Sequence, residues 1–150
     1  MTELFVAGAR IDWERVGKNS WLRRIPALNR LGEISFRKNV TFLAGENGSG
    51  KSTLLEAIAV ASGFNPEGGT RNYHFCTYEE TLELLRHIHT LAEAGAQFIV
   101  VTHSPFLLGL PGAEILSLSE KGLVPCAYEE TESFRITEMF LRHRQTMLKE

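Results

Sequence analysis

The residues best suited to do chemistry form one glycine-rich loop. Residues 45–52 follow the pattern G-x-x-x-x-G-K-[ST] of a phosphate loop, reading Gly45-Glu46-Asn47-Gly48-Ser49-Gly50-Lys51-Ser52. The glycines allow successive backbone N–H groups to point inward, and the start of the following helix adds a partial positive charge. Lys51 would contact the β- and γ-phosphates, and the Ser52 hydroxyl would be a ligand of Mg²⁺. The loop therefore predicts binding of a phosphate-rich ligand together with Mg²⁺.

A histidine is the second candidate. His103 follows an apolar run at residues 98–102, within Thr102-His103-Ser104-Pro105. Ligands of open α/β sheets bind beyond the carboxyl ends of the strands, so we expect His103 and the phosphate loop on the same rim. An imidazole there could hydrogen-bond a terminal phosphate and polarise an attacking water. A histidine after a strand is by itself more often structural, but the shared rim favours the phosphate-sensing role.

The segments around these residues alternate between strand and helix patterns. The apolar run that precedes His103 is typical of a parallel strand covered on both faces. Helices are expected where apolar residues recur every three or four positions, with glycine at the end. The expected strands are 4–11, 40–44, 97–102, 114–118 and 123–127. The expected helices are 53–63, 81–94 and 136–148. Residues 65–70 are expected to form a loop, and residues 21–37 a short strand or loop. This alternation predicts an α/β fold with a mainly parallel sheet.

Length and composition narrow the class of protein. A chain of 150 residues with 43 % hydrophobic and 23 % charged residues suits one soluble globular domain over residues 1–150. A net charge of −2 leaves no electrostatic signature of nucleic acid or anionic membrane binding. Cys76 and Cys126 show no metal or redox spacing, and neither a signal peptide nor an apolar stretch of about 18 residues is present. We therefore expect a cytoplasmic protein with reduced thiols and no membrane span.

Two segments together resemble the ABC-type ATPases. They are the phosphate loop extended to Thr53, and Val100-Val101-Thr102-His103-Ser104-Pro105. Among that family the chain is most similar to bacterial stand-alone predicted ATPases often labelled AAA family. The resemblance implies a P-loop NTPase fold with a three-layer core, ATP and Mg²⁺ as ligands, and ATP hydrolysis. It makes residues 45–53 the Walker A element and His103 the switch histidine that senses the γ-phosphate.

Part of that family's pattern is missing. The chain has a single aspartate, Asp12, which precedes the phosphate loop, and no apolar run followed by Asp-Glu that could serve as Walker B. A Ser-x-Gly signature is also absent, and the resemblance places both elements, with a helical insert, between about residues 71 and 80. Losing the Walker B strand would leave a reduced sheet with a new open edge, which is an aggregation liability. We expect the tail helix or a partner chain, such as a second copy, to cover that edge.

The missing carboxylates leave several functions open. The leading interpretation is Mg-ATP binding with weak or partner-dependent hydrolysis, for which Glu79 and Glu80 are possible substitutes, although both also suit an acidic first helical turn. An alternative is a nucleotide-gated interaction module without turnover. A small P-loop kinase and a shortened gene product without a role of its own are less favoured. Trp21 or Phe36 could stack on adenine, although core packing is favoured for each.

Overall fold

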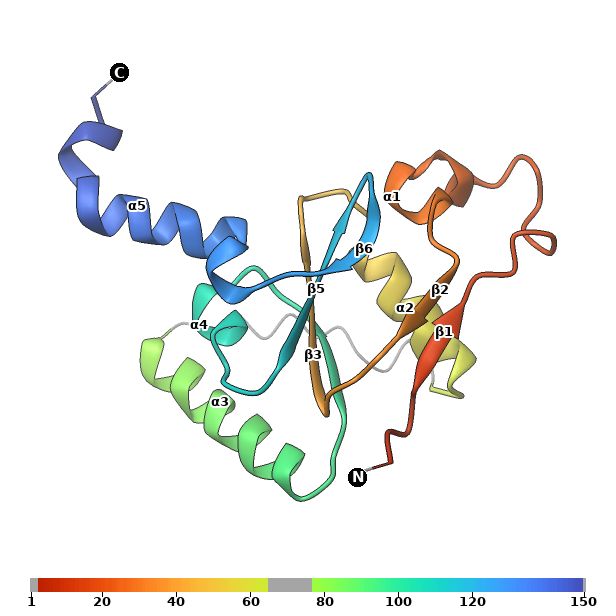
Figure 1. Ribbon diagram of the computed structural model, residues 1–150, viewed down its shortest axis with the longest axis horizontal. Coiled ribbons are helices and arrows are strands. Elements are labelled where there is room, and N and C mark those ends of the chain that lie inside the picture. Colours follow the sequence, from red (N-terminus) through yellow and green to blue (C-terminus); the bar gives the residue numbers. More distant parts are fainter. Residues whose placement is uncertain (1–2, 65–76, 150) are drawn as a thin grey trace.

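A four-stranded sheet forms the centre of the protein (Figure 1). The computed structural model describes residues 3–64 and 77–149. The strand order is β4-β3-β5-β6, with bounds Phe98–Val101, Val40–Gly45, Glu114–Ser119 and Gly122–Pro125. β3 pairs in parallel with both β4 and β5, and β6 pairs antiparallel with β5. The sheet is mixed and mostly parallel, which confirms the α/β prediction.

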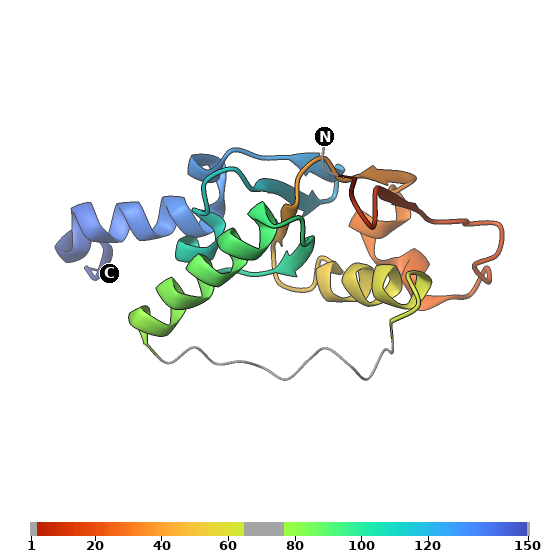
Figure 2. The ribbon, with the colours of Figure 1, turned by 90° about the horizontal axis from the view of Figure 1, so that it is seen from below.

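Helices cover both faces of this sheet. Side chains alternate along β3 because successive residues of a strand point to opposite faces. Leu43 packs in a buried cluster with Leu54 of α2 (Lys51–Ala61), whereas Phe42 packs in a second cluster with Ile88 of α3 (Tyr78–Glu93). α2 and α3 accordingly lie on opposite sides of the central strands (Figures 1 and 2).

A small second sheet lies on the α2 side. β1 (Gly8–Arg10) pairs antiparallel with β2 (Glu33–Ser35), and Ile34 of β2 is buried in the same cluster as α2. The opening strand is therefore shorter than the predicted range 4–11. The mixed segment 21–37 contains β2 and also two short helices that were not predicted, η1 (Trp21–Arg24) and α1 (Pro26–Asn29).

β4 differs from its prediction. We expected this strand to be buried on both faces, but it is the edge of the sheet, and all four of its residues are only half-buried. An unbroken apolar run does not distinguish a central strand from a half-covered edge strand. No strand in the described ranges 3–64 and 77–149 pairs with the outer edge of β4.

The boundaries of α3 follow from its caps. α3 begins at Tyr78, three residues before the predicted start, because Thr77 caps it. The Thr77 hydroxyl accepts a hydrogen bond from the Glu80 amide, and the Glu80 carboxylate accepts one from the Thr77 amide, both at 3.2 Å. Gly95 follows the helix at φ 99°, as expected for its end. The predicted loop 65–70 and the segment 71–76, with Cys76, lie outside the described residues.

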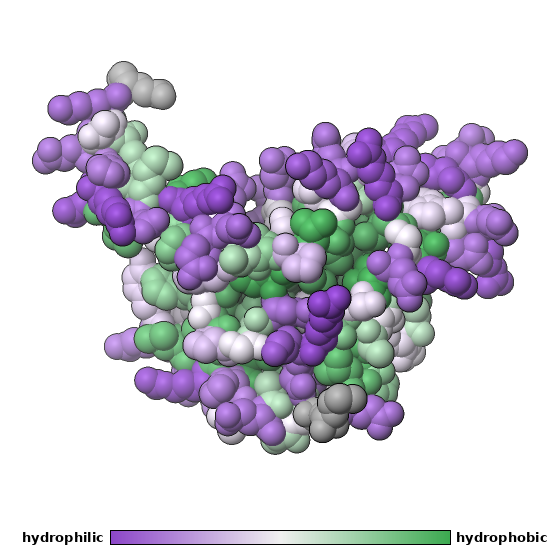
Figure 3. Space-filling model, in the orientation of Figure 1, coloured by the Kyte–Doolittle hydropathy of each residue, from purple (hydrophilic) through white to green (hydrophobic). Residues whose placement is uncertain are grey.

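The chain ends in a helix that projects from the sheet. After η2 (Tyr128–Glu130), α5 (Glu132–Met147) starts four residues before its predicted start, and it lies next to the short helix α4 (Pro105–Leu108). α5 extends away from the sheet instead of along β4 (Figures 1 and 2), so the expectation that the tail helix covers that edge is wrong. Figure 3 shows apolar surface on α5 among hydrophilic side chains. None of the described helices is long and apolar enough to cross a membrane.

Candidate functional site

The phosphate loop joins β3 to α2, as the strand–loop–helix pattern predicts. Gly45, Gly48 and Gly50 have φ angles of 135°, 80° and 95°, a region that residues with a Cβ rarely adopt. A Cβ on Gly45 would lie 2.3 Å from the carbonyl oxygen of Leu118. The loop therefore starts in direct contact with β5, and only glycine fits there.

Lys51 is the central side chain of the loop. It is 5 % exposed, and its Nζ donates hydrogen bonds to the carbonyl oxygens of Gly45 at 2.7 Å and Glu46 at 2.6 Å. A longer contact of 3.4 Å reaches the Ser49 hydroxyl. Burial lowers the pKa of Lys51 below its ordinary value of 10.5, while the negative charge of Glu46 opposes that shift. The ammonium group is thus held inside the loop by the loop's own backbone.

The start of α2 offers backbone donors beside this ammonium group. Gly50 occupies the N-cap position without a side-chain hydrogen bond, and the first turn contains no acidic residue. The amide groups of the first turn, including Ser52 and Thr53, therefore have neither a side-chain cap nor a neighbouring carboxylate from that turn competing for them. Uncapped helix starts of this kind bind anions such as phosphate.

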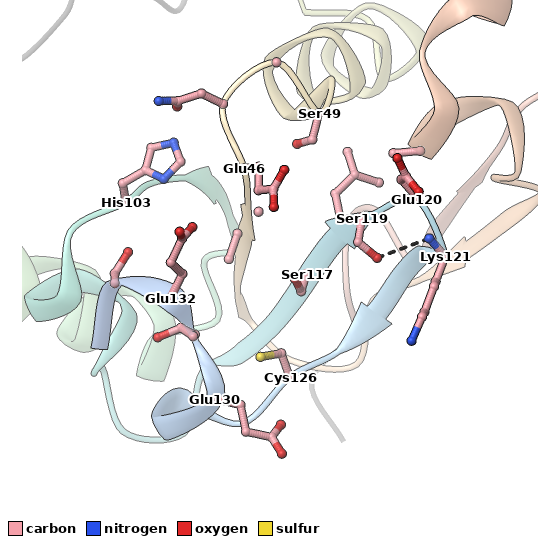
Figure 4. A pocket seen from close by; sticks show the side chains of 18 of the residues that line it. Glu46, Ser49, His103, Ser117, Ser119, Glu120, Lys121, Cys126, Glu130 and Glu132 are labelled. Atoms are coloured by element: carbon pink, nitrogen blue, oxygen red, sulfur yellow. Dashed lines mark hydrogen bonds between the residues drawn. The ribbon is translucent and has the colours of Figure 1, made fainter. Parts of the chain in front are cut away.

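A cavity of about 640 Å³ opens along the carboxyl ends of β4, β3 and β5 (Figure 4). The loop residues 45–49 form one wall, and Thr102 and His103 follow β4. The start of α1, the end of β5 with the turn to β6, Cys126 and the start of α5 also line the cavity. His103 is exposed and its ring faces the cavity (Figure 4). The structure therefore places His103 and the phosphate loop on the same rim, as expected from the topology. Residues 50–53 continue the loop into α2 and are not among the residues that line the cavity.

The carboxylates on the cavity differ from those considered in the sequence. Glu46 and Glu132 are among its lining residues, whereas Glu79 and Glu80 are not. The Glu80 carboxylate takes part in the cap of α3, which agrees with the interpretation of Glu80 as an acidic residue of the first helical turn. Glu132 was missed, although a Thr-Glu pair at residues 131–132 is a typical start of a helix.

Neither aromatic candidate for adenine stacking lines the cavity. Phe36 is buried in the core on the α2 side, as favoured, whereas Trp21 is exposed, so the prediction that it packs in the core is wrong. No group of three or more His, Cys, Asp or Glu side chains in the described parts of the chain could hold a metal ion. Mg²⁺ would have to bind through phosphate oxygens, the Ser52 hydroxyl and single carboxylates. These are the hard oxygen ligands that Mg²⁺ prefers, and it commonly uses only one or two carboxylates beside phosphates.

Comparison with known proteins supports the class of the domain. Residues 24–94 match the model of a family described as AAA domain, which is a family of P-loop ATPases. The matched span runs from η1 to the end of α3 and includes the whole phosphate loop. No curated protein and no solved structure matches the chain. The fold, the loop and the family match over residues 24–94 together support a P-loop nucleotide-binding domain.

Proposed function

We propose that the protein is an ABC-type ATP-binding domain that binds Mg-ATP through residues 45–53. The observation that carries this proposal is the buried Lys51 ammonium group, held at 2.7 Å and 2.6 Å from two loop carbonyls beside the uncapped start of α2. Positive charge and backbone amide donors therefore lie in the same loop. A triphosphate is the ligand for which that arrangement is suited.

Each residue of the loop has a distinct part in this proposal. Backbone amides of the segment Glu46 to Thr53 bind the phosphate oxygens, and Lys51 neutralises the charge of the β- and γ-phosphates. The Ser52 hydroxyl is one protein ligand for Mg²⁺, which when bound neutralises the remaining phosphate charge. The exposed ring of His103 donates a hydrogen bond to the γ-phosphate from the opposite wall, and so distinguishes ATP from ADP.

Hydrolysis is expected to be weak or to depend on a partner. Phosphoryl transfer is catalysed almost entirely by positioning and electrostatic stabilisation, which in ABC-type relatives includes two Walker B carboxylates. No carboxylate from the start of α3 lines the cavity. Removing one such stabilising group typically lowers a rate by about 10²- to 10³-fold. The same observation favours a second candidate, a nucleotide-gated interaction module that binds ATP without turnover.

The outer edge of β4 supplies a reason for a partner. Open edge strands can pair with another chain, and natural proteins usually cover them. Because no strand of the described ranges pairs with this edge and α5 extends away from it, we infer that a partner chain or a second copy lies along β4 when the site is complete. Size measurement by sedimentation with and without Mg-ATP tests this inference, and a monomer under both conditions would contradict the second copy as that partner.

Binding and turnover can be separated in one experiment. The wild-type chain, Lys51→Ala and the exposed control Lys18→Ala are titrated with ATP in millimolar Mg²⁺ by calorimetry, and phosphate release is measured on the same samples. The proposal expects saturable binding that Lys51→Ala weakens at least about tenfold, as lost charge-assisted hydrogen bonds would, and that Lys18→Ala leaves unchanged. Phosphate release above the Lys51→Ala background identifies an ATPase, and binding without release identifies the interaction module. Equal ATP affinities of wild type and Lys51→Ala would contradict both candidate functions, the ATPase and the interaction module.

A further inference from the structure

The start of α5 brings a carboxylate to the cavity from the far end of the chain. Glu132 is the first residue of α5 and lines the same cavity as Glu46 to Ser49 of the phosphate loop. Its position is well fixed by its neighbour Thr131, which is only 4 % exposed. The Thr131 hydroxyl donates to the Tyr128 carbonyl at 2.7 Å and accepts from the Phe134 amide at 3.3 Å. The helix start is therefore held by hydrogen bonds on both sides of Glu132.

The Glu132 side chain is directed toward the phosphate loop. In Figure 4 the Glu132 carboxylate points toward the space between His103 and the phosphate loop. Glu130 also lines the cavity, but it points away in the same view and its carboxylate accepts a hydrogen bond from the Ala127 amide at 3.1 Å. The Glu132 carboxylate has no hydrogen bond or ion pair with any residue of the ranges 3–64 and 77–149.

We propose that Glu132 is the carboxylate that binds the divalent cation accompanying the triphosphate, directly or through a water. The inference rests on the proposed function, since it requires a triphosphate at residues 45–53. Two carboxylates and a triphosphate in one cavity repel each other unless a cation lies between them. Mg²⁺ typically takes one or two carboxylates together with phosphate oxygens. Glu132 thus supplies from α5 the carboxylate that is absent before α3.

This role predicts effects of opposite sign with and without metal. Glu132→Gln removes a ligand of the cation, so ATP affinity in millimolar Mg²⁺ should fall about tenfold, the usual effect of losing a group around a bound metal. In EDTA the same change removes a charge that repels the phosphates, so ATP affinity should rise about threefold, as for exposed charge pairs. Glu129→Gln is the matched control, because Glu129 is an exposed glutamate three residues away that does not line the cavity.

Calorimetric titration of wild type, Glu132→Gln, Glu132→Asp and Glu129→Gln under both conditions tests the proposal without measuring turnover. The proposal expects only Glu132→Gln to show the crossed effect, that is, a lower ATP affinity in Mg²⁺ and a higher one in EDTA. Glu132→Asp keeps the charge and should lie closer to wild type. A fall of affinity in both conditions would assign Glu132 a structural role, and no change in either would leave it without a role; both results overturn the inference. If the wild type binds ATP through Lys51 and only the crossed effect is missing, this inference fails alone. If the wild type binds no ATP, the proposed function fails and this inference fails with it.

Discussion

The phenol hydroxyl of Tyr128 donates a hydrogen bond of 2.7 Å to the backbone carbonyl of Pro105. Pro105 is the first residue of α4 and lies two residues after His103, whereas Tyr128 opens η2, which leads into α5. The Tyr128 ring also packs edge-on against Phe134 at 4.8 Å between ring centroids, and a Cβ on Gly109 would come within 3.1 Å of it. One side chain thus joins the turn that carries His103 to the start of α5, which are two walls of the cavity.

Tyr128→Phe removes only this hydroxyl. We expect the free energy of unfolding to fall by about 1 kcal/mol, the usual net value of an intramolecular hydrogen bond. Urea denaturation measures the change. Tyr78→Phe is the control, because Tyr78 is 73 % exposed and its hydroxyl has no hydrogen-bond partner in the described ranges; that variant should stay within about 0.5 kcal/mol of wild type. Equal effects of the two substitutions would show that the contact between Tyr128 and Pro105 does not stabilise the fold.

Substituting Gly45 and Gly48 by alanine distinguishes the cost of backbone strain from the cost of a steric clash. Both have positive φ angles, but a Cβ on Gly45 would lie 2.3 Å from a backbone oxygen, whereas one on Gly48 would meet nothing within 4 Å. Gly48→Ala should therefore cost about 1 kcal/mol of stability, from the left-handed conformation alone. Gly45→Ala should cost about 3 kcal/mol or more, because rigid backbone must move as well. Thermal unfolding of the two variants compares them, and a smaller loss for Gly45→Ala would contradict the close approach to β5.

The phosphate loop could be predicted from the sequence because its conformation is local. The glycines that need positive φ angles, the lysine that returns to the loop carbonyls and the helix that follows are all encoded within residues 45–61. Its neighbours β4 and β5 could be predicted from apolar runs, and both pair in parallel with β3 as expected.

The remaining features depend on distant parts of the chain. The apolar run of β4 is compatible with a central strand, and its edge position depends on which other strands the chain contains. The apolar spacing of the tail begins at Ile136, so periodicity overlooked the first turn of α5 and with it Glu132. The cap formed by Thr131 could have revealed that turn. That Glu132 faces the phosphate loop depends on the β5–β6 hairpin, which brings the chain back to the cavity.

Thr131 offers a test of how firmly the start of α5 is held. Thr131→Ala removes the cap of α5 and the hydrogen bond to the Tyr128 carbonyl, so we expect a loss of about 1–2 kcal/mol in the free energy of unfolding. Thr131→Ser keeps the hydroxyl and should recover most of that loss. Urea denaturation of both variants provides the measurement. If serine is as destabilising as alanine, packing of the buried threonine methyl group, and not the cap, stabilises this turn.

The buried ammonium group of Lys51 predicts a pH dependence of stability. Below its lowered pKa, Lys51 is protonated in both the folded and the unfolded chain, and burial of the charge destabilises the fold. Between that pKa and 10.5, the unfolded chain binds more protons, so the free energy of unfolding rises with pH. Lys51→Met keeps the apolar stem without the charge. The stability of wild type relative to Lys51→Met should therefore increase as pH rises through this window, as measured by urea denaturation at each pH.

Nucleotide binding should respond to the same titration in the opposite direction. The neutral amine no longer attracts phosphate, so ATP affinity of the wild type should begin to decline at a pH below 10.5, the ordinary pKa of a lysine. Lys51→Met should bind ATP weakly and lack this decline, and the exposed control Lys18→Met should show it unchanged. Fluorescence titration with a labelled ATP analogue at each pH measures these affinities. Parallel pH profiles for wild type and Lys51→Met would mean that the Lys51 ammonium group does not contact the bound phosphates, and the phosphate site would then have to be placed elsewhere on the cavity.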